Sequence, residues 1–298
     1  MTKISVVVTT YNRPKYLSET LDAIFSQTHK NFEVILVDDG SKDNYVDAYS
    51  EKYPELIIIK KVNAGHGAAR NTGVAHSSGE WVAFCDDDDV WLPEKLERQV
   101  EAIDYDAEAG LIHGRIEHID ADGKRLKTET LVDGYYYYRR GHVFLKAIEV
   151  VLVKSPTPII KRTVFDEIGG FNEQIRVGED VDFFMKAAFY TKFLYLDVVL
   201  AKYRTHSPEQ LSFKKAEYLL ITPFLLEFVK EKRNKMNFKT YLAAKKAIVR
   251  RHLWELNNNK KRLDSKTFFY LTKIYLFFIF DIKSLKKIRA NLIITQKC

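Results

Sequence analysis

The sequence predicts an α/β fold with a mainly parallel sheet, a small antiparallel portion and a C-terminal helical extension. Three observations support this. Short apolar runs rich in β-branched residues alternate with helical stretches in the N-terminal third. Polar motifs follow three of these runs. The last part of the chain is rich in lysine and aromatic residues. Alternating strands and helices imply parallel strands joined by right-handed crossovers.

The strands expected in the N-terminal third are short enough, and apolar enough, to be buried on both faces of a sheet. They are Ile4–Thr9, Phe32–Val37, Leu56–Lys60 and Glu80–Cys85. The helical stretches between them begin at Pro14, which suits a first helical turn, and cover Asp43–Tyr53 and Gly65–Ala75. Ligands of such sheets bind at the carboxyl ends of the strands.

The pattern changes beyond residue 110. An antiparallel hairpin is expected from Leu111–Ile119 and Arg125–Thr130, with Asp122-Gly123 as its turn. Further on, the sequence predicts a helix over Asp180–Tyr190 and a closing strand over Phe193–Arg204. We therefore expect one domain over residues 1–210, with halves 1–110 and 111–210, and a basic, aromatic-rich helical extension over residues 211–298.

The composition is that of a globular protein, with 46% hydrophobic and 29% charged residues among 298. Charge is unevenly distributed: residues 214–298 hold 21 Lys+Arg and 6 Asp+Glu, whereas residues 1–213 hold 26 and 34. Such asymmetry suggests two tasks. The two cysteines, Cys85 and Cys298, do not indicate a disulfide framework. The N-terminus lacks the pattern of a signal peptide, so a cytoplasmic protein is expected.

Four consecutive aspartates, Asp86 to Asp89, follow the apolar run Trp81–Cys85. Like charges this close repel, and burial increases the cost, so a divalent cation is the simplest compensation. A plain acidic helix start explains one or two of these aspartates but not four after a buried strand. A calcium-binding EF-hand loop is excluded because its sixth position, here Trp91, requires glycine.

Six motifs in order resemble the GT-A-fold glycosyltransferases of family 2, over roughly residues 1–206. They are Val8–Arg13, Val37-Asp38-Asp39-Gly40-Ser41, Asn63–Asn71, Phe84–Asp89, Gly169-Gly170-Phe171 and Gly178-Glu179-Asp180. The resemblance implies an inverting enzyme that moves a sugar from a nucleotide donor, most simply a UDP-sugar. The acceptor would be a glycan or a lipid-linked saccharide.

Carried over position by position, the resemblance places the donor nucleotide against Thr9, Tyr11, Arg13, Asp39, Arg70, Asp86 and Asp87. Tyr11 would stack on the base, and Asp39 would accept the uracil N3–H, a hydrogen bond strengthened by charge. Side chains two residues apart on an extended segment point the same way. Asp86 and Asp88 would therefore face the ribose and the metal, with Asp87 directed away from the metal.

The same resemblance makes Asp88 a ligand of Mn²⁺ or Mg²⁺, with His206 completing the site. It makes Asp180 the general base, which takes the proton of the acceptor hydroxyl. Asp182 would face elsewhere on the helix. Acceptor-binding positions are expected at Gly170, Phe171, Glu179 and Trp91, although Trp91 could instead simply pack.

Two other functions stay open at this point. A strand followed by Asp-x-Asp also resembles the haloacid-dehalogenase phosphatases, in which Asp86 would be the nucleophile. The fold could also belong to a non-catalytic protein that binds a nucleotide-sugar or a glycan. The two are separable, because a phosphatase hydrolyses a generic phosphate ester and a binder shows no turnover with any acceptor.

The basic, aromatic tail has three interpretations. Residues 265–298 could bind the inner face of the cell membrane, because a basic amphipathic helix suits an anionic interface. The tail could instead be a structural appendage or join a second copy of this chain as a homo-oligomer. No nucleic-acid-binding motif is present, so nucleic acid is not expected as a partner. The apolar run Thr267–Ile282 contains Lys273 and is short for a membrane span of about 20 residues.

Overall fold

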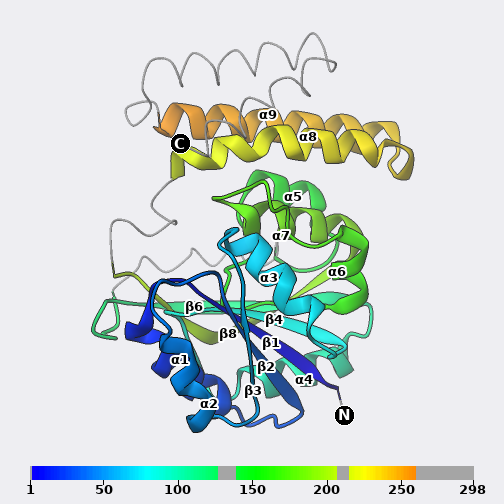
Figure 1. Cartoon of the computed structure of the whole chain (residues 1–298). Helices are drawn as coiled ribbons and strands as arrows, with labels where there is room; N and C mark the ends of the chain where they lie inside the picture. Colours follow the sequence, from blue (N-terminus) through cyan, green and yellow to red (C-terminus); the bar gives the residue numbers. More distant parts are fainter. Residues whose placement is uncertain (1, 127–138, 207–214, 260–298) are drawn as a thin grey trace.

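The structure, a computed structural model, describes residues 2–126, 139–206 and 215–259 (Figure 1). Over these residues the strands form one sheet in the order β3-β2-β1-β4-β7-β6-β8-β5. The N-terminal strands are mutually parallel and are β1 (Ile4–Thr10), β2 (Phe32–Asp38), β3 (Leu56–Lys60) and β4 (Trp81–Asp86). All four were predicted, within one residue at each end.

The remaining strands make the sheet mixed. They are β5 (Val90–Trp91), β6 (Ala109–Ile119), β7 (Ile159–Lys161) and β8 (Lys192–Arg204). β7 is antiparallel to both β4 and β6, β5 is antiparallel to β8, and β6 is parallel to β8. The expected α/β fold of GT-A type, mainly parallel with a small antiparallel portion, is confirmed.

The helices of the first two thirds of the chain cover the two faces of the sheet. They are α1 (Pro14–Phe25), η1 (Tyr45–Ala48), α2 (Tyr49–Lys52), α3 (His66–Ala75), α4 (Lys95–Tyr105), α5 (Phe144–Glu149), α6 (Arg162–Ile168) and α7 (Glu179–Tyr190). The stretch predicted as one helix over Asp43–Tyr53 is a 3₁₀ turn followed by a single α-turn. Helices α4, α5 and α6 were not predicted.

The described residues include the turn of the predicted hairpin after β6 and the first pairing beyond it. Gly123 N donates to Asp120 O at 3.1 Å, and an isolated antiparallel bridge joins Ile119 to Arg125. Most of the expected second strand, Arg125–Thr130, lies outside the described residues.

Two hydrophobic cores lie on opposite faces of the sheet. Alternate residues of β1 point to opposite sides, as the pleat of a strand requires. Val7 belongs to the core under α3, α6 and α7, while Val6 and Val8 belong to the core under α1 and α4. Figure 1 shows these two groups of helices above and below the sheet.

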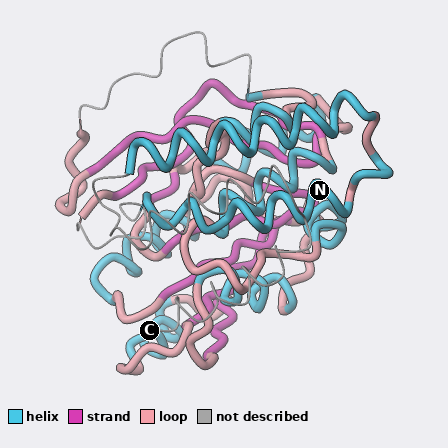
Figure 2. The backbone as a smooth tube through the Cα atoms, turned by 90° about the horizontal axis from the view of Figure 1, so that it is seen from above, coloured by secondary structure: helices cyan, strands magenta, loops and turns pink. Residues whose placement is uncertain are grey.

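The helical extension packs on the first of these cores. It comprises η4 (Lys215–Ile221), α8 (Thr222–Glu231), η5 (Arg233–Lys235) and α9 (Phe238–Asn259). Helices α8 and α9 lie side by side as a further layer beyond α5 and α7 (Figures 1 and 2). Phe224, Phe228 and Ile248 belong to the same buried cluster as Val7. Within the described ranges, no helix is long and apolar enough to cross a membrane; the tail 265–298 lies outside them.

Candidate functional site

The three polar motifs of the N-terminal half meet at one edge of the sheet. In the parallel register, Thr10 of β1 is the partner of Asp38 of β2, and Thr9 is the partner of Asp86 of β4. Adjacent parallel strands therefore end together, and the segments that follow them lie side by side. This is the edge at which open α/β sheets bind ligands.

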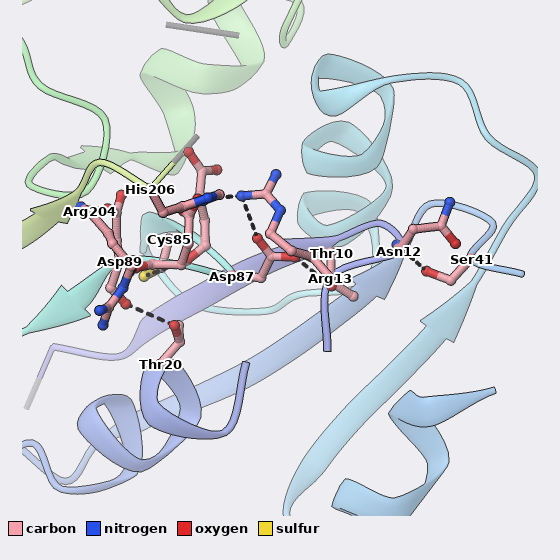
Figure 3. Close-up of polar contacts among 12 residues, drawn as sticks. Thr10, Asn12, Arg13, Thr20, Ser41, Cys85, Asp87, Asp89, Arg204 and His206 are labelled. Carbon is pink, nitrogen blue, oxygen red and sulfur yellow. Dashed lines mark hydrogen bonds and ion pairs between the residues drawn. The ribbon is translucent and has the colours of Figure 1, made fainter. Parts of the chain in front are cut away.

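The first two aspartates of the run have different cationic partners. Asp86 Oδ1 accepts from the Arg70 guanidinium at 2.8 Å. Asp87 accepts from Thr10 Oγ1 at 2.6 Å and pairs with Arg13 at 3.2 Å (Figure 3). Asp87 is 2% exposed, so its carboxylate fastens β1 to the aspartate run and points into the protein.

The last two aspartates are held by the end of β8. Asp88 Oδ2 contacts both the Arg13 guanidinium and His206 Nε2, the latter at 2.9 Å. Asp89 Oδ1 accepts the backbone N–H of Arg204 at 3.0 Å, and its backbone carbonyl accepts from Thr20 Oγ1 at 2.9 Å (Figure 3). The buried Asp89 Oδ2 has no hydrogen-bond partner among the described residues.

These partners separate the pKa values of neighbouring carboxyls. Burial would raise the pKa of Asp86, but the charge and hydrogen bond of Arg70, together with His66 and Arg13, outweigh it and hold that pKa below its ordinary value. For Asp87 burial wins over Arg13, and its pKa rises to about 7. Burial raises the pKa of Asp89 well above its ordinary value, and the Asp88 charge adds to this. The run therefore does not carry four full negative charges.

Arg70 joins the two halves of the site. Its guanidinium donates to Asp86 at 2.8 Å and to Glu179 Oε1, the first residue of α7, at 2.7 Å. The guanidinium also lies over the Phe171 ring, 5.2 Å from its centroid. Helix α3 approaches the sheet closely because residue 73 is glycine, where a Cβ would lie 2.3 Å from Val7 Cγ1. This close packing brings Arg70, on the same helix, next to the carboxyl end of the sheet.

Asp180 lies half-buried in the first turn of α7. Its Oδ1 accepts the N–H of Val181 at 2.8 Å. Burial raises the pKa of Asp180 to about 6, and the Glu179 charge adds to the effect while Arg70 opposes it. At neutral pH the carboxyl is mostly ionised and more basic than an ordinary aspartate, which suits proton abstraction.

The predicted nucleobase side is formed by β1 and β2. Tyr11 is 44% exposed at the end of β1, as a stacking surface requires. The buried Asp39 carboxylate accepts from Lys61 Nζ at 2.9 Å, from Ala64 N at 3.0 Å and from Gly65 N at 2.7 Å. It therefore orders the loop before α3. The Thr9 hydroxyl is buried and makes no hydrogen bond within the described residues.

Three residues expected to bind the acceptor are packed inside the protein. Trp91 is 2% exposed and lies in the second core, with Lys95 Nζ 3.8 Å from its ring centroid. Phe171 is 3% exposed and stacks on Phe183 with centroids 4.1 Å apart. Glu179 is 6% exposed and is paired with Arg70. These three side chains contact neighbouring groups of the protein, and little of their surface is exposed to an acceptor.

Gly170 has a clearer backbone role. Its φ of +75° lies in the left-handed region, which favours glycine, and a Cβ there would lie 2.7 Å from Asn71 Oδ1. Asn71 spans the same turn: its Oδ1 accepts from Phe171 N at 2.8 Å and its Nδ2 donates to Phe171 O at 2.9 Å. The turn is thereby fixed to α3 next to Arg70.

Sequence reasoning missed Arg204, which is 1% exposed. Its guanidinium donates to the Asp88 carbonyl at 2.9 Å and to Glu19 at 2.6 Å, and lies 4.6 Å from the Tyr16 ring centroid. It ties the aspartate run to β8 and α1. A charged residue at the end of an apolar strand, two positions before His206, is the signal that could have identified it.

The residues at Asp88 fit a divalent cation. An octahedral ion with ligands at about 2.1 Å places neighbouring ligands roughly 3 Å apart, and Asp88 Oδ2 and His206 Nε2 are 2.9 Å apart. Within the described ranges no cluster of three or more His, Cys, Asp or Glu side chains that could hold a metal ion occurs. An ion such as Mg²⁺ is commonly held by one or two protein carboxylates, with substrate phosphates and water as its remaining ligands.

Comparison with known proteins agrees with this architecture. The family described as "Glycosyl transferase family 2" matches residues 5–169, more than half of the chain. An uncharacterized glycosyltransferase of Rickettsia felis is 33% identical over 207 residues, which cover 68% of this chain and 33% of that protein. The chain therefore belongs to glycosyl transferase family 2. It spans between a third and three fifths of the length of several such curated relatives.

Solved structures share the fold. S. aureus TarS 1-349 in complex with UDP-GlcNAc superposes with a TM-score of 0.74 at 20% identity, over 98% of this chain and 88% of that one. Mannosyltransferase PcManGT from Pyrobaculum calidifontis, in complex with GDP-Man and Mn²⁺, gives a TM-score of 0.60 at 19% identity, over 97% of this chain and 84% of that one.

The Arg70 bridge predicts a pH-dependent stability defect. Arg70→Met leaves the buried carboxylate of Glu179 and the partly buried carboxylate of Asp86 without the Arg70 cation. We expect a loss of about 3–5 kcal/mol in the free energy of unfolding at pH 7.5, measured by urea denaturation. Without Arg70 both carboxyl pKa values rise in the folded state, so the loss should shrink as pH falls through them.

Arg70→Met with Glu179→Gln is the matched control, because it removes one of the stranded charges. This double variant should recover part of the lost stability at pH 7.5. If Arg70→Met were equally destabilised at pH 5 and pH 7.5, or not at all, the electrostatic role of Arg70 would be wrong.

Proposed function

We propose that the protein is an inverting glycosyltransferase that moves a sugar from a nucleotide donor, a UDP-sugar, to a hydroxyl of a glycan or lipid-linked saccharide. The observation that carries the proposal is the Arg70 bridge. It holds the carboxylate edge of the sheet, suited to a nucleoside diphosphate and a cation, next to the half-buried Asp180. Membership of glycosyl transferase family 2 supports the reaction class.

The donor nucleotide would lie over the carboxyl ends of β1 and β2. Tyr11 offers an exposed ring for stacking on the base. Asp39 Oδ2 accepts one protein N–H, and a carboxylate oxygen has a second lone pair for the uracil N3–H. The neighbours TarS and PcManGT bind UDP-GlcNAc and GDP-Man respectively. The choice of uridine therefore rests on Asp39.

The diphosphate would lie beside Asp88, His206 and Arg13. Asp88 and His206 would hold a divalent cation, which would supply positive charge to the departing diphosphate. Arg13 contacts both Asp87 and Asp88, so its guanidinium is placed to add a second positive charge to the leaving group. Asp86 is directed by Arg70 and would accept hydrogen bonds from the ribose hydroxyls.

Asp180 would act on the acceptor. The acceptor oxygen forms a bond to the anomeric carbon while the bond from that carbon to the diphosphate oxygen breaks. The hydroxyl proton passes to the Asp180 carboxylate, and the nucleoside diphosphate leaves with the bonding electron pair. Attack from the face opposite the leaving group inverts the anomeric configuration. The positive charge of Arg70 limits the rise in the Asp180 pKa, so the base stays ionised at neutral pH.

The phosphatase alternative fits the geometry less well. A nucleophilic Asp86 needs a free carboxylate oxygen aimed at a phosphorus atom. Here Arg70 engages that carboxylate, and Asp86 ends the fourth strand of the chain instead of the first. In a non-catalytic binding protein, the raised pKa of Asp180 would have no function. Release of phosphate from p-nitrophenyl phosphate would favour the first alternative over the transferase.

The base assignment gives a kinetic prediction. Asp180→Asn should lower kcat by about 10²–10⁴-fold with little change in UDP-sugar binding. In the unaltered chain, kcat should rise with pH through about 6 and then level off, because the base must be ionised. Asp122→Asn, in an exposed turn, is the control and should keep the wild-type profile. Transfer by Asp180→Asn at the wild-type rate would remove Asp180 as the base.

The metal assignment predicts a specific loss of cation dependence. His206→Ala should raise the Mn²⁺ concentration needed for UDP to stabilise the protein by roughly tenfold or more, measured by thermal shift. The exposed His142 is the control, and His142→Ala should titrate like the unaltered chain. EDTA should abolish the UDP-dependent shift in both. An unchanged Mn²⁺ titration in His206→Ala would exclude His206 as a ligand.

We also propose that the extension contacts an anionic membrane surface, which would bring the site to a lipid-linked acceptor. Helix α9 exposes Phe238 and Trp254, 67% and 63% accessible, with Leu242 and Leu253 at 39% and 38%. The exposed Lys239 and Lys246 lie on the same helix. Aromatic and basic side chains together suit the headgroup region of an acidic bilayer.

Co-sedimentation with vesicles of phosphatidylglycerol and phosphatidylcholine tests this surface. Phe238→Ser with Trp254→Ser should lower the bound fraction several-fold, and added salt should lower it further because screening weakens the lysine contribution. Tyr105→Ser removes an aromatic ring that is 87% exposed on α4, far from α9, and should bind like the unaltered chain. If the double serine variant and a chain ending at residue 264 both bound normally, the membrane proposal would be wrong.

A further inference from the structure

The extension contributes a side chain next to the proposed base. The Tyr218 ring, from η4, lies against Gly178, the N-cap residue of α7. A Cβ placed on Gly178 would lie 2.5 Å from Tyr218 Cδ1 and 2.8 Å from Cε1, and Gly178 has a φ of +82°. The ring therefore occupies the space that a side chain at position 178 would take. Only a glycine accommodates both the backbone conformation and this contact.

This contact lies two residues before Asp180. The Gly178 carbonyl accepts the N–H of Asp182 at 3.0 Å, which is the first hydrogen bond of α7. A ring packed on Gly178 thus limits movement of the turn that carries Glu179 and Asp180. Because the Tyr218 ring is packed against Gly178, the backbone of this turn cannot shift unless the ring shifts with it.

The Tyr218 hydroxyl also lies within electrostatic range of the carboxylates of Glu179 and Asp180. Burial raises the pKa of the Tyr218 hydroxyl, and the Asp180 and Glu179 charges raise it further, so the phenol stays neutral. The pKa of Asp180 is itself raised mainly by burial. A neutral, mostly apolar ring packed on Gly178, two residues before Asp180, would help to exclude water from this carboxyl without adding charge.

Tyr218 is held in place by the rest of the extension. The nearby Leu219 and Ile221 are each 1% exposed, and Ile221 belongs to the first core. Thr222 Oγ1 lies 2.9 Å from His252 Nδ1, which joins the start of α8 to α9. Arg251 of α9 lies 3.3 Å from the Ile148 carbonyl and 3.4 Å from Met185 Sδ of α7. Helix α9 is therefore fastened to the helix that carries Asp180.

We propose that Tyr218 is a positioning residue for the transfer reaction, which fixes the N-terminus of α7 and shields Asp180 from water. The inference rests on the proposed role of Asp180 as the base. It assigns part of the catalytic arrangement to the extension, beyond the residues 5–169 that match the family. Tyr218 acts through Asp180 and does not itself exchange a proton.

Tyr218→Ala tests the proposal by the pH dependence of kcat. Removing the ring admits water to Asp180 and lowers its pKa, so the acid limb, expected near pH 6, should move to lower pH by roughly half a unit or more. At pH 7.5 kcat should fall by about tenfold or more because the base is less well placed. The KM for the UDP-sugar should change little, and Tyr218→Phe should restore most of both losses.

Tyr241→Ala is the matched control. Tyr241 is another partly buried tyrosine of the extension that packs on the same core. Its loss should lower the melting temperature without moving the acid limb. If Tyr218→Ala does not fold, Tyr218→Leu keeps most of the bulk and should give a smaller shift in the same direction.

The possible failures are distinguishable. An unaltered chain that transfers no sugar from any nucleotide donor would overturn the proposed function. An active chain whose acid limb and kcat are the same in folded Tyr218→Ala or Tyr218→Leu would overturn the role of Tyr218 and leave Asp180 as the base. A shift equal to that of Tyr241→Ala would also overturn it, because a general packing loss would then suffice.

Discussion

The ion bridge from the partly buried Asp86 through the buried Arg70 to the buried Glu179 is the interaction on which the site depends. It joins the end of β4 to the start of α7, which are far apart in the sequence. Burying a guanidinium is costly unless it is fully paired, and two carboxylates supply that pairing. The arginine reaches both because Gly73 lets α3 pack directly on β1. Close packing and charge pairing are thus two parts of one arrangement.

The same bridge explains how so many carboxyl groups share one edge. Arg70 keeps Asp86 ionised, whereas burial raises the pKa of Asp87 and Asp89. Thr10 donates a hydrogen bond to Asp87, and the backbone N–H of Arg204 donates one to Asp89. Asp88 lies between Arg13 and His206. Four identical residues therefore have different charges and roles, which are set by their neighbours.

Features of the structure that depend on residues close together in the sequence could be predicted, whereas contacts between residues far apart in the sequence could not. The strands β1 to β4 and the position of the aspartate run follow from local apolar patterns, and the sequence predicted them. The partners of Arg70 do not follow from local patterns. The motif around Arg70 predicted a contact with the nucleotide, whereas in the folded chain Arg70 pairs with Glu179. Trp91 shows the same limit, because its burial beside Lys95 depends on how α4 packs. Arg204 and Tyr218 belong to no motif, and only the folded chain brings them to the site.

The distribution of these residues separates the site into two parts. The groups that would bind the nucleotide, from Thr9 to Asp88, lie within the segment that matches the family. Asp180 and Tyr218 lie beyond it, on elements whose packing depends on the extension. A hydrophobic core shared by β1, α7 and α8 makes the position of Asp180, the proposed base, depend on packing residues far from the proposed nucleotide site.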